Sequence, residues 1–166
     1  MAETRIRWAT ENDAALIVRF IKALAIFEKE PVEHVHITDA DVRRDAFAST
    51  RRFEVLIAEV DRSAVGFALF FPNYSTWEGK PGLYIEDIFV EESRRGTGIG
   101  RKLIAAVAKI AASRGCARID LAVLNWNPAR GFYNRLGFRH AEPWQIFRLA
   151  EDGLNALSTE ASDFIV

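Results

Sequence analysis

The sequence contains a single cysteine, Cys116, and no apolar run long enough to span a membrane. One cysteine excludes a disulfide within the chain, and we expect Cys116 to be a core residue. The N-terminal stretch Met1–Arg5 leads directly into an amphipathic pattern and does not resemble a signal peptide. These absences favour a cytoplasmic protein.

The sequence also lacks an excess of one charge. It has 22 Lys and Arg against 23 Asp and Glu, which gives a formal net charge of -1. A nucleic-acid-binding protein usually carries a basic excess or a basic stripe, so we expect no nucleic acid as a partner. Because no apolar run is long enough to span a membrane, we expect no membrane as a partner either. The histidines His34, His36 and His140 show no metal spacing with acids or cysteine, and no metal is expected.

No repeat, low-complexity tract or linker divides the 166 residues. We therefore expect a single domain, with a core over about 1–150 and a C-terminal tail over 151–166. Strand-like and helix-like patterns alternate, as is typical of a mixed α/β domain. Strands are expected at 5–9, 54–60, 64–71, 83–90, 117–124 and 144–149, and helices at about 16–27, 38–48, 99–114 and 129–136.

A glycine-rich loop joins the apolar strand that begins at Leu83 to an amphipathic helix. Gly96, Gly98 and Gly100 allow a sharp turn and a close approach to a ligand. The helix that follows presents unpaired N–H groups and the positive end of its dipole, an arrangement that binds phosphate or pyrophosphate. Further positive charge comes from Arg94, Arg95, Arg101 and Lys102.

Two other kinds of phosphate loop fit this sequence poorly. A P-loop ends in Gly-Lys-Ser/Thr, whereas Gly100 is followed by Arg101 and Lys102. A dinucleotide fingerprint needs a third glycine after Gly98-Ile99-Gly100 and an acid at the end of the next strand. The third glycine is absent, and Asp120 lies inside that strand.

Two motifs resemble the GNAT acetyltransferase family. Arg95–Gly100 matches its Arg/Gln-x-x-Gly-x-Gly/Ala acyl-CoA loop, and Phe132–Phe138 is similar to its Phe-Tyr helix ending in Gly-Phe. From Arg5 to Leu149 the chain resembles the spermidine/spermine and thialysine N-acetyltransferase branch. The resemblance implies an α/β (α+β) GNAT fold, with a mixed, mostly antiparallel twisted sheet of about seven strands and about four flanking helices. It also implies acetyl-CoA as cosubstrate and a homodimer.

By this resemblance the chain acetylates a primary amine of a small molecule, a polyamine, diamine or thialysine-like compound, by direct attack on the thioester. An alkylammonium has a pKa near ~10.4, so only about one molecule in 10³ is free amine at neutral pH, and a base is needed. The resemblance implies Glu86, acting through water, as that base and Tyr133 as the acid toward the leaving thiolate. Strand alternation places Glu86 and Asp87 on opposite faces, and the role of Asp87 stays open.

The resemblance also implies two sets of binding residues. The acyl-CoA contacts are Ile88, Phe89, Val90, Arg95, Gly96, Thr97, Gly98, Ile99, Gly100, Arg101 and Asn127. The amine pocket consists of Phe27, Glu28, Glu86, Asp120 and Glu142.

Three positions depart from the branch or have a second interpretation. Asn127 is also suited to cap the helix that follows it, and Asn125 could replace it in the cofactor contact. Phe27 stands where the branch often has Tyr, which weakens the case for polyamine specificity.

Two other functions stay open: acetylation of a protein N-terminus or lysine, and a non-catalytic acyl-CoA-binding module.

Overall fold

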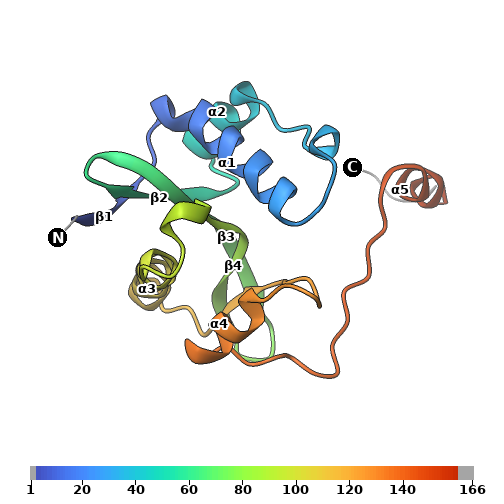
Figure 1. Cartoon of the computed structure of the whole chain (residues 1–166). Helices are drawn as coiled ribbons and strands as arrows, with labels where there is room; N and C mark the ends of the chain where they lie inside the picture. Colours follow the sequence, from blue (N-terminus) through green and yellow to red (C-terminus); the bar gives the residue numbers. More distant parts are fainter. Residues whose placement is uncertain (1–2, 161–166) are drawn as a thin grey trace. The chain divides into compact units, whose positions relative to one another are not determined.

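The computed structural model describes residues 3–160 (Figure 1). It comprises two compact units, one ending at Arg130 and the other beginning at Gly131, and the predicted single domain stays a prediction. Along the chain the elements are β1 (Thr4–Trp8), η1 (Glu11–Asp13), α1 (Ala14–Phe27), η2 (Val32–His34), α2 (Asp39–Phe47), β2 (Glu54–Val60), β3 (Ser63–Ser75), β4 (Lys80–Val90), η3 (Glu92–Arg94), α3 (Ile99–Ser113), β5 (Ile119–Leu121), α4 (Ala129–Arg135) and α5 (Glu151–Ser158).

The sheet has the order β1-β2-β3-β4-β5. The pairs β1/β2, β2/β3 and β3/β4 are antiparallel, whereas β5 pairs with β4 in parallel. The predicted α/β class with a mixed, mostly antiparallel sheet is therefore confirmed, although the described residues form five strands and not seven.

The prediction of a strand at 144–149 is wrong. These residues have no regular structure, and the side chains of Ile146 and Phe147 are 73% and 91% exposed. An alternating apolar pattern forms a strand only where a neighbouring strand accepts its hydrogen bonds and another layer covers its apolar face. The strand expected at 117–124 is shortened to Ile119–Leu121, and α5 was not predicted.

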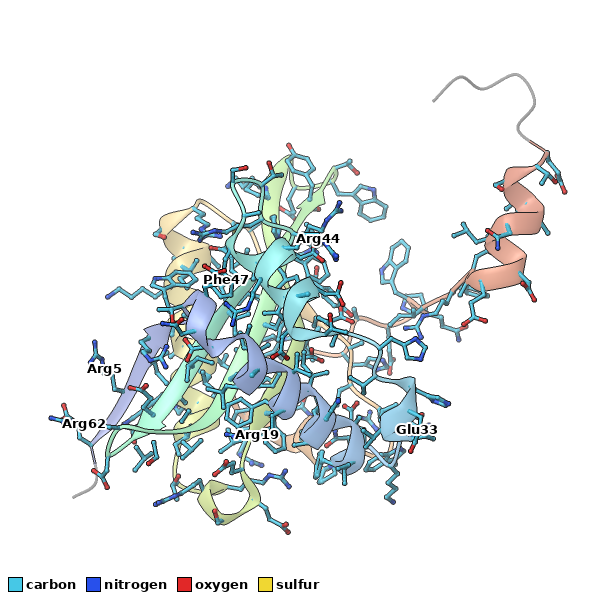
Figure 2. All side chains as sticks on the ribbon, turned by 90° about the horizontal axis from the view of Figure 1, so that it is seen from above. Arg5, Arg19, Glu33, Arg44, Phe47 and Arg62 are labelled. Carbon is cyan, nitrogen blue, oxygen red and sulfur yellow. The ribbon has the colours of Figure 1, made fainter. Side chains whose placement is uncertain are left out.

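Within the first unit, α1 and α2 cover one face of the sheet and α3 covers the other (Figure 1). The amphipathic spacing of α1 buries Ile17 and Phe20, and the Phe20 ring stacks on Phe67 of β3 at 5.6 Å between centroids. Figure 2 shows the same face from above, with the side chains of α1 and α2 over the strands. On the opposite side, α3 buries Ile99, Leu103, Ile104, Val107 and Ala111.

The start of α1 is fixed to the sheet by an ion pair. Arg7 of β1 contacts both carboxylate oxygens of Asp13, at 2.8 and 2.9 Å, and also donates to Glu59 of β2 at 2.6 Å. The hydrogen bonds from Arg7 hold the pKa of Asp13 at about 2, well below its usual value.

None of the helices within residues 3–160 has the length and apolar character needed to cross a membrane.

Candidate functional site

The glycine-rich loop is shaped by two residues in the left-handed region. Gly96 has φ 77° and Gly98 has φ 87°, and Gly98 is the N-cap of α3. A Cβ atom at either position would meet nothing within 4 Å, so the glycines provide an unusual backbone conformation and an open surface. The Lys102 N–H donates to the Gly98 carbonyl, and the amides preceding Lys102 have no intrahelical acceptor. The loop therefore fits a pyrophosphate.

The side chain of Arg95, the first residue of this loop, folds back onto the sheet. Its Nε donates to the carbonyl oxygen of Val90 at 2.9 Å. Its Cζ lies 4.2 Å from the centre of the Phe27 ring at the end of α1 and 5.6 Å from that of Phe89 on β4. The loop is thus connected through one guanidinium to both β4 and α1.

A β-bulge interrupts β4 at Glu86, the residue predicted as the catalytic base. In the ladder with β3, Ile85 pairs with Phe70 and Asp87 pairs with Leu69, so Glu86 is the extra residue. Leu69 and Phe70 are consecutive and face opposite sides of the sheet. Ile85 and Asp87 therefore also lie on opposite faces, although uninterrupted alternation would place them on the same one. Bulges of this kind commonly occur beside active sites.

The open edge of β4 begins at the same place. Pairing with β5 covers Leu83–Ile85 and ends there, and among the described residues no strand continues it. The Glu91 N–H donates to Val65 of β3, so by strand geometry the backbone groups of Ile88 and Val90 point toward the open edge. Extended ligands with amide groups, such as pantetheine, can pair with such an edge.

Three carboxylates interact electrostatically next to the bulge. The pKa of Asp87 is raised to about 7, first by burial and then by the negative charges of Glu86 and Glu28. Burial and the charge of Glu30 also raise the pKa of Glu28, the C-cap residue that follows α1. Glu86 itself is exposed to solvent. We refer to Glu28, Glu86 and Asp87 as the acidic cluster, and Asp87 is the member whose role the sequence left open.

Asp120 has other partners. Its Oδ2 accepts hydrogen bonds from Asn73 Nδ2 at 3.0 Å and from Arg118 Nε at 2.8 Å, and Arg118 also reaches Ser75 Oγ. These contacts join β5 to the hairpin between β3 and β4. They support a structural role for Asp120, whereas the sequence predicted a role in the amine pocket.

Asn127 is buried, and its Oδ1 accepts the Ala129 N–H at 2.9 Å. This is the bond of an N-cap residue, one of the two roles considered from the sequence. The backbone carbonyl of Asn125 accepts a hydrogen bond from Arg130 Nη1 at 3.0 Å. Both asparagines thus help to shape the start of α4.

Two predicted residues belong to the second compact unit. Tyr133 is buried in α4, with ring centres 5.3 Å from Phe132 and 5.7 Å from Phe138. Glu142 is exposed, and its carboxylate lies 3.0 Å from His140 Nδ1. The aromatic packing fixes the orientation of the Tyr133 ring within this unit.

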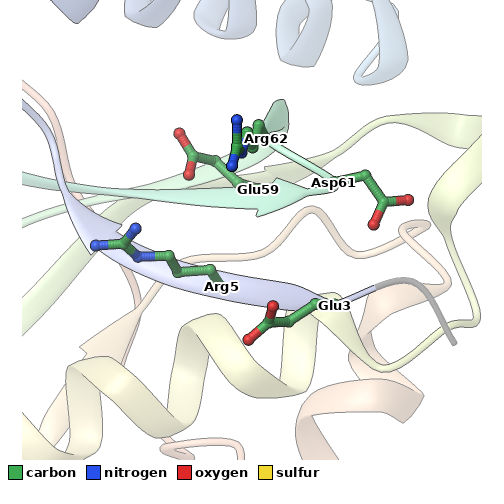
Figure 3. Close-up of a pocket in the computed structure, with 5 residues that line it drawn as sticks. All are labelled: Glu3, Arg5, Glu59, Asp61 and Arg62. Atoms are coloured by element: carbon green, nitrogen blue, oxygen red, sulfur yellow. The ribbon is translucent and has the colours of Figure 1, made fainter.

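A hollow of about 680 Å³ lies elsewhere on the first unit, at the edge formed by β1 and the turn between β2 and β3 (Figure 3). Its lining combines the acids Glu3, Glu59 and Asp61 with the arginines Arg5 and Arg62. None of the residues predicted for catalysis or binding lines this hollow. Within residues 3–160, no set of three or more His, Cys, Asp or Glu side chains is placed to hold a metal ion.

The acetyltransferase (GNAT) family matches residues 20–138. The thialysine N-epsilon-acetyltransferase of Bos taurus is 38% identical over 170 residues, which cover 95% of this chain and 99% of that protein. The L-ornithine N5-acetyltransferase of Arabidopsis thaliana is 31% identical, over 93% of this chain and 87% of that protein.

Solved structures share the fold. An integron cassette protein from the mobile metagenome of V. cholerae has a TM-score of 0.76 at 24% identity, over 93% of this chain and 97% of that chain. An aminoglycoside N-acetyltransferase solved in complex with CoA has a TM-score of 0.72 at 24% identity, over 89% and 95%. At this level of identity the likeness shows the fold alone.

Proposed function

The chain belongs to the acetyltransferase (GNAT) family, and from this premise we propose that it transfers the acetyl group of acetyl-CoA to a primary amine of a small cationic molecule. The predicted family, GNAT fold and acetyltransferase class are confirmed. Two similar proteins are named for thialysine and L-ornithine, both of which have a primary amine on a side chain. We propose an acceptor of this kind.

The acidic cluster carries this proposal. Three carboxylates next to the open edge of β4 create a negative potential that attracts ammonium groups. A cation bound beside Asp87 would favour its ionised form, because an opposite charge lowers the pKa of a carboxyl. We therefore propose that Glu28 and Glu86 line the amine pocket, as predicted from the sequence, and that Asp87 lines it as well.

The chemical step requires a free amine. We propose that Glu86, exposed at the bulge, accepts the ammonium proton through water. The amine nitrogen then attacks the thioester carbonyl carbon and loses its second proton to solvent, so that a C–N bond forms and the C–S bond breaks. The sulfur leaves as a thiolate, and in our proposal the Tyr133 hydroxyl stabilises it and donates a proton, which solvent replaces. The products are the N-acetylamine, free CoA and one proton released to solvent.

The loop and the open edge of β4 would hold acetyl-CoA. The amides at the start of α3, together with Arg101 and Lys102, fit its pyrophosphate. The backbone groups of Ile88 and Val90 fit the amides of its pantetheine arm. The predicted cytoplasmic location and the homodimer implied by the resemblance stay predictions.

An amine panel with detection of released thiol tests this function. The panel contains thialysine, ornithine, spermidine, short diamines and neutral monoamines, with a lysine-containing peptide for the alternative protein substrate. We expect turnover with amines that carry a second charged group near the reacting one, and little with the peptide or the neutral amines. Tight CoA binding with no turnover on any amine would instead support a non-catalytic module.

A further inference from the structure

We propose that Phe27 is a positioning residue for the acyl-CoA loop, through the guanidinium of Arg95. This inference rests on the proposed function, because it assumes that the loop binds acyl-CoA. The sequence predicted Phe27 as part of the amine pocket. In the structure its ring lies 4.2 Å from Cζ of Arg95, within the range of a cation–π contact.

Three contacts together define the position of the Arg95 side chain. Phe27 of α1 and Phe89 of β4 contact its guanidinium, and Val90 accepts a hydrogen bond from its Nε. A guanidinium has five N–H donors, so the four on its two Nη atoms remain for phosphate oxygens. A free arginine side chain samples many rotamers, and holding it in place before binding reduces the ordering cost of binding.

The end of α1 makes a second contact of the same type. Lys29 Nζ lies 4.6 Å from the centre of the Trp126 ring, in the loop that follows β5. The segment Phe27–Lys29 therefore touches both the loop that follows β4 and the loop that follows β5, and it includes Glu28 of the acidic cluster. The C-terminal end of α1, next to Glu28 of the acidic cluster, thus also supports the acyl-CoA loop.

Binding of CoA to the full chain, measured by isothermal titration calorimetry, tests this inference. We compare the wild type with Phe27→Leu, Arg95→Gln and the double variant. Phe27→Leu should weaken CoA binding about 2- to 5-fold, the range that corresponds to an exposed cation–π contact. In the Arg95→Gln background the same substitution should have almost no further effect, because the cation that the ring positions is gone.

Controls separate this role from a general loss of structure. Phe27→Tyr and Phe27→Trp retain a ring and should restore the affinity for CoA that Phe27→Leu loses. Ile26→Ala alters an exposed neighbour on the same helix and should leave CoA binding as in the wild type. In steady-state kinetics, Phe27→Leu should raise KM for acetyl-CoA and not KM for the amine.

Equal weakening by Phe27→Leu in both backgrounds would overturn the inference, as would a rise in KM for the amine alone. The binding experiment needs no acceptor. It therefore gives an answer even if the amine panel shows no turnover, and the two proposals can fail separately.

Discussion

Asp87 pairs with Leu69 across the ladder between β3 and β4, which places a carboxyl on the same sheet face as a core leucine. Leu69 packs in the cluster beneath α1, together with Ile17 and Phe20. An ionised carboxylate is costly at such a position, because the apolar surroundings replace water. The raised pKa of Asp87 expresses this cost.

The stability of the protein should therefore depend on the protonation of Asp87. Its pKa is about 7 in the folded chain and 3.8 in the unfolded chain, taken as the ordinary value. Between about pH 4 and about pH 7 the unfolded state loses this proton while the folded state keeps it, so folding becomes less favourable as the pH rises. Asp87→Asn lacks this penalty. Relative to wild type it should gain about 2–4 kcal/mol of unfolding free energy on going from about pH 4 to about pH 8.

Denaturant unfolding of both proteins at a series of pH values measures this difference. Glu33→Gln, at an exposed position on η2, is a suitable control and should show no such trend. A constant difference between Asp87→Asn and wild type across the pH range would contradict the half-buried position of this carboxyl beside the core.

Gly98 and Gly115 offer a matched pair for testing the loop. Both have positive φ, at the start and just after the end of α3, and neither has atoms within 4 Å of a Cβ position. Alanine at either position should cost about 1–2 kcal/mol of stability, because an L-residue is strained in this region. Only Gly98→Ala should also raise KM for acetyl-CoA, by about 5-fold or more. Steady-state kinetics and thermal unfolding measure the two effects, and an equal effect of both variants on KM would argue against a cofactor role for the loop.

Glu86→Gln should lower kcat/KM for the amine about 10²-fold, because it removes the proposed proton acceptor. The activity that remains should rise with pH, since the variant depends on the small fraction of amine that is already deprotonated. Glu92→Gln, another exposed acid close in sequence, is the control and should behave like wild type. Similar pH–rate profiles for Glu86→Gln and wild type would show that Glu86 is not the base.

Tyr133→Phe should lower kcat about 10- to 10²-fold while binding of CoA changes little, because the hydroxyl is proposed to act on the departing thiolate. The packing against Phe132 and Phe138 does not involve the hydroxyl and should survive the substitution. Tyr74→Phe removes a hydroxyl from an exposed tyrosine and provides the comparison. Rapid-mixing measurements of thiol release resolve the step, and an unchanged rate would leave Tyr133 as a packing residue.

Much of the fold could be predicted because local patterns define it. The strand 54–60 has the bounds predicted from its apolar residues, and the helical spacing from Leu16 to Phe27 marks α1 almost to the residue. The loop at Arg95–Gly100 was also predicted, because glycines with positive φ before a helix leave a clear pattern in the sequence.

The features that the sequence could not show depend on partners distant in the chain. The bulge at Glu86 is a property of the register with β3, and no local signal near Glu86 marks it. The contact between Arg95 and Phe27 joins residues from α1 and from the loop before α3, and the hydrogen bond between Asn73 and Asp120 joins β3 to β5. At 144–149 the apolar pattern predicted a strand, but those side chains remain exposed without a neighbouring strand.

The most direct test of the proposed activity is product analysis by mass spectrometry of the wild-type chain incubated with acetyl-CoA and thialysine. We predict one N-acetylated amine for each thiol released, and almost no product from Glu86→Gln under the same conditions. Thiol release without an acetylated amine, or acetylation at the same rate by the variant, would contradict direct acetyl transfer at the acidic cluster.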